Sequence, residues 1–492
     1  MSNNLVSTQE KIKITENYLA KLLRIAKNSF QKNNIESVMS ALSAYCAIQY
    51  QVNQVYTDTQ AEDLIMQLSK QQVLVPKDFI PDPKAVLFYD GFGLDLRGWA
   101  ASFIKALIGA NYKVVYVAPY HKKDMVPHIL AELEQGNGTT VWINMNQSYV
   151  TWMTELNTAF QKYQPGTAFY YTTPNDISAA TVFNAYVGKV NRISIDLTDH
   201  AFWIGVNAFD YIVESRMPGF SNLVFYRGVP AEKILNSDCC PYVNRQPDLT
   251  PLPFDIEKES YVFSGGSLYK TLGDNNLLFY KIVNHILENH NQIKFIYAGE
   301  GDDSELNKII EKYPGRAYHI HERTDFIRLF ENCVFFLNTY PMFGGLMMRY
   351  AAMVGKIPLT LRHSSDHEGI LYDQEKRKIE YDTYDEIIID VDRLIEDEIF
   401  RKEREKLLEG SVLTEQDFQN VVQRMIEEKT TGKPLPKIEN LDTTAFRAEY
   451  LERLNVQDML LKTIPSRLNR KLIRQFPYLF IKKFIVKKRS QK

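Results

Sequence analysis

The spacing of apolar residues changes along the chain and divides it into regions. Between residues 8 and 75, apolar positions recur every three or four residues, as in ENYLAKLLRIAKNSF and IESVMSALSAYCAIQYQV. That spacing is typical of amphipathic helices, so we expect two or three helices in a module covering residues 1–78. The proline-rich stretch VPKDFIPDPK then marks a boundary.

Short apolar runs replace the helical spacing after this boundary. Helix-length segments separate the runs AVLFY, KVVYVA, TVWINM, AFYYTT, RISIDL, YIVES and LVFYRG. Runs that are apolar throughout indicate strands covered on both faces, as in parallel sheets. We therefore expect a Rossmann-like domain over residues 83–245.

The alternation restarts after a second linker, NRQPDLTPLPFDIEKES. The runs YVFSGG, IKFIYAG, AYHIH, CVFFLNT, KIPLTL and EIIIDV predict the strands of another such domain over residues 255–425. Ligands of doubly wound sheets bind at the carboxyl ends of the strands. The expected fold class is α/β, with two doubly wound domains facing a cleft and the helical N-terminal module beside them.

Charge distinguishes the end of the chain from its body. The 492 residues are 45% hydrophobic and 24% charged, which is ordinary for a globular protein. Residues 463–492, however, hold ten lysines and arginines and no acidic residue, with aromatic residues among them. We expect C-terminal helices and a basic tail over residues 430–492, and we expect the tail to associate with an anionic membrane surface. A solvated tail or a nucleic-acid patch is the alternative, and the acidic body disfavours nucleic acid.

The sequence shows no targeting or disulfide pattern. It has no apolar leader, no run long enough to cross a bilayer, and only four cysteines without a framework spacing. We therefore expect a cytoplasmic protein that lies peripherally at the inner face of the cell membrane.

Two glycine-rich turns follow predicted strands and are candidate phosphate sites. Gly91 and Gly93 lie in YDGFGLDLRGW, which lacks the spacing of a dinucleotide fingerprint and so disfavours a nicotinamide-dependent oxidoreductase. In the second domain, FSGGSLYK combines backbone N–H groups, hydroxyls and a lysine, which together suit a diphosphate. The candidate ligands there are Ser264, Gly265, Gly266, Ser267 and Lys270. Purely structural glycine turns, with a solvated lysine, are the alternative.

Two later turns add polar candidates. In LNTYPMFGG a strand ends at Asn338 and a helix opens after the turn, so its free N–H groups form another anion site with Asn338, Phe343, Gly344 and Gly345. In RHSSDHEGILYD, His367 and Glu368 follow a strand. Without a third helical ligand in register, contacts to a sugar or phosphate fit these residues better than a metal.

The stretch ISIDLTDHAFWIG places three ionisable groups at the end of a predicted buried strand: Asp196, Asp199 and His200. In the functional interpretation, a carboxylate orients His200, which takes a proton from an attacking hydroxyl as a general base. A satisfied core histidine is the structural alternative. No serine or cysteine nucleophile sits in a strand–turn–helix elbow, which argues against a hydrolase.

Together these features resemble GT-B glycosyltransferases over roughly residues 83–425. YDGFGLDLRG, LTDHAFWIG, YRGVPAEKI and HEGILYD are similar to glycosyltransferases of bacterial capsule and exopolysaccharide clusters. The segment from AGEG through MFGG is similar to protein glucosyltransferases of the O-GlcNAc transferase type. The resemblance implies a UDP-sugar donor held by the second domain, no cofactor and no obligatory metal. It also implies a lipid-linked oligosaccharide, polysaccharide precursor or protein acceptor.

The resemblance also assigns donor-binding roles to individual residues. It places the diphosphate at Lys270, a helix N-terminus at residues 343–345, and the base-side loop at residues 319–323, which adds His321 and Arg323. Many retaining GT-B enzymes carry two glutamates seven residues apart near this helix, whereas PMFGGLMMRYAA has none. The chain is therefore expected to be an inverting enzyme, or else a non-catalytic partner of an active glycosyltransferase.

Overall fold

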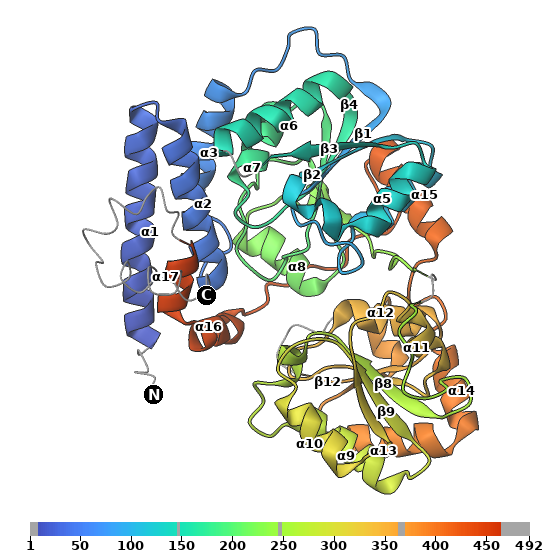
Figure 1. Cartoon of the computed structure of the whole chain (residues 1–492). Helices are drawn as coiled ribbons and strands as arrows, with labels where there is room; N and C mark the ends of the chain where they lie inside the picture. Colours follow the sequence, from blue (N-terminus) through green and yellow to red (C-terminus); the bar gives the residue numbers. More distant parts are fainter. Residues whose placement is uncertain (1–7, 145–147, 245–247, 363–369, 464–492) are drawn as a thin grey trace. The chain divides into compact units, whose positions relative to one another are not determined.

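The computed structural model describes residues 8–144, 148–244, 248–362 and 370–463. These residues form two compact units, each built on its own sheet (Figure 1). Unit 1 takes the described parts of residues 1–214, 218–237 and 419–492, and unit 2 takes those of 215–217 and 238–418. Unit 2 is therefore an insertion within the sequence of unit 1.

Unit 1 contains a seven-stranded sheet in the order β3-β2-β1-β4-β5-β6-β7, with every neighbouring pair parallel. The order reverses between β1 and β4, which is where doubly wound sheets open a ligand crevice. Its strands are β1 Asp82–Asp90, β2 Lys113–Pro119, β3 Thr139–Ile143, β4 Pro165–Tyr171, β5 Asn191–Ile195, β6 Tyr211–Glu214 and β7 Ile234–Asn236.

Helices cover both faces of this sheet. Alternate residues of β1 point to opposite sides: Leu87 and Tyr89 join the core beneath α2, α6 and α7, while Phe88 packs on Phe103 of α4. The helices of unit 1 are α1 Thr8–Gln31, α2 Ile35–Val52, α3 Thr59–Gln72, α4 Ala100–Gly109, α5 Pro127–Gln135, α6 Tyr149–Tyr163, α7 Ile177–Ala185, α8 Met217–Ser221, α15 Glu415–Glu427, α16 Thr444–Arg453 and α17 Val456–Thr463, of which α8 and α15 begin in unit 2.

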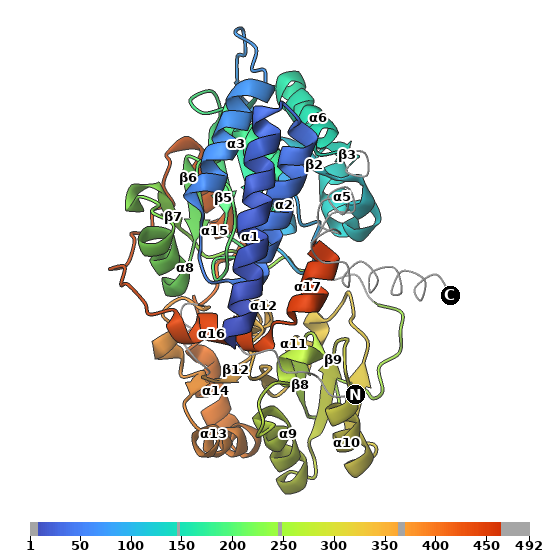
Figure 2. The same ribbon diagram turned by 90° about the vertical axis from the view of Figure 1, so that its left-hand side faces the viewer.

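The N-terminal helices and the last described helices pack together (Figure 2). Lys11 Nζ of α1 donates to the carbonyl of Leu451 in α16 at 2.8 Å. Gln54, just after α2, donates to the carbonyl of Arg447 at 3.0 Å. Residues from the first and from the last described helices thus join the core of unit 1.

Unit 2 contains a six-stranded parallel sheet in the order β10-β9-β8-β11-β12-β13, which reverses between β8 and β11. Its strands are β8 Tyr261–Gly265, β9 Lys294–Ala298, β10 Ala317–Ile320, β11 Phe336–Leu337, β12 Pro358–Leu361 and β13 Glu380–Tyr381. Its helices are α9 Leu278–Asn289, α10 Ser304–Lys312, α11 Ile327–Asn332, α12 Gly345–Met353, α13 Tyr384–Glu396 and α14 Glu398–Lys406.

Two predicted strands are wrong. The run LVFYRG lies largely in a π-helical turn, η2 (Asn222–Tyr226), and EIIIDV lies inside α13. In α13 the buried residues Ile387, Val391 and Leu394 follow helical spacing, while Ile389 is 61% exposed. A capping box between Thr383 and Glu386 begins the helix and outweighs the strand preference of three successive isoleucines.

The predicted membrane anchor lies outside the described residues, because the structure describes the chain only as far as residue 463. Among the helices that are described, none is both long and apolar enough to cross a bilayer. Association of the tail with a membrane therefore stays a prediction.

Candidate active site

In unit 2, the loops after β8 and β11 meet at the point where the strand order reverses. Met342 N–H, in the loop after β11, donates to the carbonyl of Lys270 at 3.2 Å. The predicted glycine loop at residues 264–270 and the predicted helix-opening turn at residues 338–345 are thus neighbours. This edge is where a doubly wound sheet binds its ligands.

The loop after β8 depends on two glycines with left-handed backbone. Gly266 has φ +127°, and Gly299, after the neighbouring strand β9, has φ +158°. A Cβ on Gly299 would lie 1.9 Å from the carbonyl oxygen of Gly266, so no other residue fits there. Tyr297 holds the same carbonyl with its hydroxyl at 3.0 Å. The close approach of the two loops fixes the path of the backbone before Ser267.

Lys270 is a partly buried cation in this loop. Burial lowers the pKa of its ammonium group, and no carboxylate among the described residues pairs with it. Ser264 lies at the end of β8, just before this loop, and its fully buried Oγ has no hydrogen-bond partner within the described part of the chain. A partly buried cation without a counter-charge favours an anionic ligand.

Asn338 organises the turn before α12. Its Oδ1 accepts from Gly344 N–H at 2.9 Å, and its Nδ2 donates to Thr360 Oγ1 at 3.3 Å. The side chain of Asn338 is therefore buried, with both polar atoms hydrogen-bonded inside unit 2. It fixes the start of the helix at Gly345. Phe343 packs against Gly345 at this turn. The N–H groups of the first helical turn have no intrahelical acceptor and can serve an anion.

Two other predicted ligands of unit 2 have partners within the protein. Arg323 is buried, with its Nε 2.8 Å from Asp325 Oδ1 and its guanidinium also donating to the carbonyls of Thr250 and Asp248. His321 is exposed and lies 2.8 Å from Glu300 Oε1. His367 and Glu368 lie outside the described residues.

In unit 1, the polar residues of the glycine turn after β1 bond within the fold. Buried Asp90 accepts the N–H groups of Phe92 and Gly93, at 3.0 and 2.8 Å, and the hydroxyl of Tyr116. Burial raises the pKa of Asp90 to about 6 despite these bonds. A Cβ on Gly91 would lie 3.2 Å from Asp176 Oδ2. These contacts give Gly91 and Gly93 a packing role in the turn.

The loop that carries His200 follows β5 and is held by the end of α2. Asn53 has left-handed backbone, with φ +48°, and its side chain lies against this loop. Its Nδ2 donates to the His200 carbonyl at 3.0 Å, and its Oδ1 accepts Phe202 N–H at 3.0 Å. The N-terminal helices thus position the candidate base directly.

A buried arginine holds the same loop from the other side. Arg227 donates through both terminal nitrogens to the Asp199 carbonyl at 3.2 Å, and through one of them to the Ala201 carbonyl at 2.5 Å. Its guanidinium also lies 4.5 Å from the ring centre of Trp203. Asn222 adds a bond from its Nδ2 to the Asp199 carbonyl at 3.0 Å.

The structure brings the predicted catalytic residues together. His200 Nδ1 lies 3.2 Å from Asp199 Oδ1, and the imidazole is 29% exposed while Asp199 is buried. Asp196 has a buried Oδ2 without a hydrogen-bond partner among the described residues. Burial raises the pKa of Asp196 to about 6, which the nearby charge of Arg227 partly opposes. The arrangement can orient an imidazole so that its Nε2 accepts a proton.

Sequence reasoning missed several residues that build these sites. Arg227 lies in YRGVPAEKI, a stretch that carries the family resemblance, yet its role depends on a carbonyl 28 positions away. Asn53 lies 147 positions from His200. The only signal for Asn53 is an asparagine just after a helical pattern, which predicts a left-handed helix end and nothing about a distant loop.

Comparison with solved structures identifies the fold. No protein-family model matches the chain, and no curated protein sequence matches it. A glycosyltransferase from Rickettsia africae ESF-5 is similar with a TM-score of 0.50 at 10% identity, over 70% of this chain and 98% of that chain. A mutant O-GlcNAc transferase from Thermobaculum terrenum gives a TM-score of 0.47 at 16% identity, over 79% and 78%. A UDP-GlcNAc 2-epimerase from Neisseria meningitidis bound to UDP-GlcNAc gives 0.48 at 12%, over 70% and 98%.

The likeness to the Rickettsia protein shows a shared fold. Both units of this chain are doubly wound parallel α/β structures, and the predicted fold class of GT-B type, with two Rossmann-like domains, is confirmed. The helices at residues 8–72 belong to unit 1. At this level of identity the comparison concerns the fold alone.

Proposed function

We propose that the chain is a glycosyltransferase that moves a sugar from a nucleotide-sugar to a hydroxyl of a cell-surface polysaccharide precursor or glycoprotein. The observation that carries the proposal is the place of Lys270, a partly buried cation without a carboxylate partner in the described residues, beyond the carboxyl end of β8 and against the loop after β11. A diphosphate supplies the charge that this site lacks. The motif resemblance favours a UDP-sugar as the donor, with no cofactor and no metal.

In this proposal unit 1 supplies the base. His200 Nε2 takes the proton of the acceptor hydroxyl while the hydroxyl oxygen forms a bond to the sugar and the bond from the sugar to the diphosphate breaks. Asp199, 3.2 Å from Nδ1, holds the ring orientation and stabilises the imidazolium that results. Asp196 and Arg227 are the other charged groups that interact with this pair. Lys270 stabilises the negative charge that the leaving diphosphate carries.

Donor binding tests the Lys270 assignment. Lys270→Ala should weaken the affinity for UDP by roughly a hundredfold, because an unpaired diphosphate charge costs about 2–3 kcal/mol. Lys258→Ala is the matched control, since that lysine is exposed and pairs only with Asp255 at the surface of unit 2. Equal UDP titrations for both variants would place the phosphates elsewhere.

Turnover tests the His200 assignment separately. His200→Ala should abolish sugar transfer while UDP-sugar affinity stays within a few-fold, because the imidazole acts on the acceptor proton and not on the diphosphate. His121→Ala, at an exposed position of the same unit, should leave transfer unchanged. Wild-type turnover in His200→Ala would remove this residue from the mechanism.

A second candidate function is a non-catalytic partner of an active glycosyltransferase. The observation that favours it is α12, whose sequence GLMMRYAAM contains no acidic residue. The purified chain would then bind UDP through Lys270 but neither transfer nor hydrolyse a UDP-sugar alone. Turnover by the isolated chain separates the two functions.

We also propose that the basic tail brings the enzyme to a membrane, where lipid-linked acceptors are found. Each basic residue near an anionic leaflet contributes about 1 kcal/mol. Full-length protein should therefore sediment with anionic liposomes, and a chain ending at Leu461 should not. Pelleting that is equal for both chains, or unaffected by added salt, would rule out an electrostatic anchor.

A further inference from the structure

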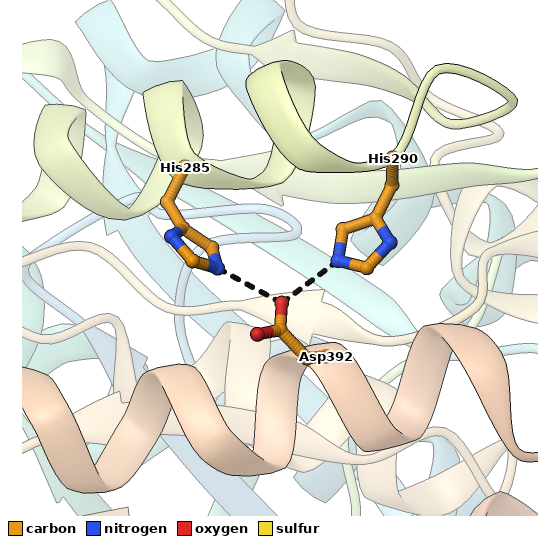
Figure 3. Close-up of side chains that lie close together, drawn as sticks. All are labelled: His285, His290 and Asp392. Carbon is orange, nitrogen blue, oxygen red and sulfur yellow. Dashed lines mark hydrogen bonds and ion pairs between the residues drawn. The ribbon is translucent and has the colours of Figure 1, made fainter.

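Two histidines and an aspartate link helices α9 and α13 of unit 2 (Figure 3). His285 lies in α9, His290 is the residue that caps its C-terminus, and Asp392 lies in α13. Both Nε2 atoms approach the same oxygen, Asp392 Oδ1, at 2.9 Å from His285 and 2.7 Å from His290. The three potential ligand atoms all lie within 4.8 Å of one another.

We propose that this cluster binds a divalent transition-metal ion of the zinc class. Imidazole nitrogen and carboxylate oxygen are ligands that Zn²⁺ prefers, at bond lengths of about 2.0 Å. Tetrahedral bonds of that length hold the ligand atoms about 3.3 Å apart. To admit an ion, the carboxylate needs to withdraw from each imidazole by about half an ångström, and the two imidazole nitrogens need to close to the same spacing. Three protein ligands leave the fourth position to water.

The second nitrogen of each imidazole also has a partner. Glu396 Oε1 lies 3.6 Å from His290 Nδ1, and Asn289 Nδ2 lies 3.2 Å from His285 Nδ1. Metal-bound histidines usually donate this second N–H to a carboxylate or an amide oxygen. On binding, each ring would move its proton from Nε2 to Nδ1, where Glu396 can accept it from His290. Asn289 would have to give up the bond from its Nδ2 to the His285 carbonyl, at 3.0 Å, before its oxygen could accept from His285.

Of the two aspartates in the sequence Asp390-Val391-Asp392, only one is available as a ligand. Asp390 is already engaged, since it forms an ion pair with Arg404 and accepts the Tyr381 hydroxyl at 2.5 Å. Asp392 lies two positions later and faces the histidines (Figure 3). His290 is 3% exposed, whereas Asp392 is 35% exposed, so the cluster is anchored in the fold and open to solvent on one side.

The position of the cluster indicates a structural role. His290 ends α9 just before the amino end of β9, whereas Lys270 follows the carboxyl end of β8. Because β8 and β9 are parallel, the cluster lies near the amino ends of the strands, and the candidate diphosphate loop lies near their carboxyl ends. A bound ion would link α9 to α13 within unit 2 and would stabilise the fold without taking part in sugar transfer.

Metal titration of the full chain tests the proposal. The protein is purified without a histidine tag, stripped with a chelator, and titrated with Zn²⁺ by calorimetry and with Co²⁺ by visible absorption. We expect one ion per chain, a tetrahedral Co²⁺ spectrum, and a higher Tm with Zn²⁺. Asp392→Asn and His285→Gln should each weaken binding more than about a hundredfold, because losing an outer partner alone costs roughly 10–100-fold.

His321→Gln is the control, since that histidine is exposed in the same unit and pairs with Glu300. It should bind Zn²⁺ like the wild type, and Glu396→Gln should bind about tenfold more weakly. Circular dichroism of the metal-free variants separates ligand loss from misfolding. The absence of stoichiometric binding in the wild type, or equal affinities for Asp392→Asn and His321→Gln, would overturn the proposal and leave the cluster as a hydrogen-bonded link.

Discussion

Arg227 holds the backbone on both sides of the candidate base His200. Its guanidinium holds the carbonyls of Asp199 and Ala201, and its charge opposes the effect of burial on the pKa of Asp196. Planar donors in a fixed fork can bind two carbonyls at once, which a lysine ammonium does less well. In the proposed reaction, the orientation of the base would therefore depend on Arg227 through the backbone of its loop.

Graded substitution of Arg227 separates its charge from its shape. Arg227→Met leaves buried carboxylates uncompensated and should lower the free energy of unfolding by about 3–5 kcal/mol. Arg227→Lys keeps the charge and should cost about 1–2 kcal/mol. Urea denaturation measures both, with Lys437→Met at an exposed ion pair as the control, expected to change stability by less than about 1 kcal/mol. Equal stabilities for Arg227→Met and the control would contradict this role.

For individual side chains, the sequence predicts contacts only between residues that are close along the chain. Asp199 and His200 are adjacent, so their pairing could be anticipated. The contact of Gly299 with Gly266 could not, because it depends on how the loops of two neighbouring strands pass each other. The family resemblance implies that Arg323 is a ligand, but a resemblance does not reveal that Asp325 lies beside its guanidinium.

At the scale of elements, the end of α2 supports the loop after β5. Asn53 combines a left-handed backbone with two hydrogen bonds to that loop. Asn53→Gly keeps the backbone conformation and loses both bonds, so it should cost about 2 kcal/mol of unfolding free energy. Asn53→Ala should cost about 1 kcal/mol more, because alanine disfavours φ near +48°. Equal losses for the two variants, measured by thermal and urea unfolding, would show that backbone strain plays no part.

Helix α13 shows why strand prediction failed at EIIIDV. Isoleucine favours strands locally, but only the face with Ile387 is buried, whereas Ile389 is exposed. The strands themselves were mostly predicted correctly, because parallel strands buried on both faces have uninterrupted apolar runs. A three-residue isoleucine run cannot by itself distinguish a strand from one face of a helix.

A pair of substitutions tests this assignment. Ile387→Ala should destabilise unit 2 by about 3 kcal/mol, as expected for a large-to-small change in a core. Ile389→Ala should change stability by less than about 0.5 kcal/mol, because its side chain is largely in water. Circular dichroism and urea unfolding of the full chain provide the comparison, and similar costs for both positions would favour a strand buried on both faces.

For the molecule as a whole, buried carboxyl groups make unit 1 sensitive to pH. Glu62 is the extreme case: burial raises its pKa to about 7, although its Oε1 accepts the N–H groups of Gly205 and Val206. The folded state therefore binds more protons than the unfolded state between pH 4.5 and about 7. The contribution of Glu62 to stability is full below this window and is lost as the pH rises through it.

The pH dependence of unfolding tests this linkage. From pH 4.5 to 7.5, the wild type should lose on the order of 3 kcal/mol more unfolding free energy than Glu62→Gln, given 1.36 kcal/mol per pKa unit. The glutamine keeps an oxygen acceptor for both N–H groups but does not titrate. Parallel stability curves for the two proteins would show that folding does not raise the pKa of Glu62.

The insertion of unit 2 has a consequence for biosynthesis. Unit 1 is complete only when residues 419–463 are added to it, and α1 receives its partner in α16 more than four hundred residues after leaving the ribosome. Unit 2, by contrast, has all but three of its residues in one continuous stretch. Unit 2 can therefore fold while translation is still under way. Until α16 and α17 have been synthesised, the apolar surface of α1 and α2 that packs against them stays exposed. That interval is when the growing chain most needs a chaperone.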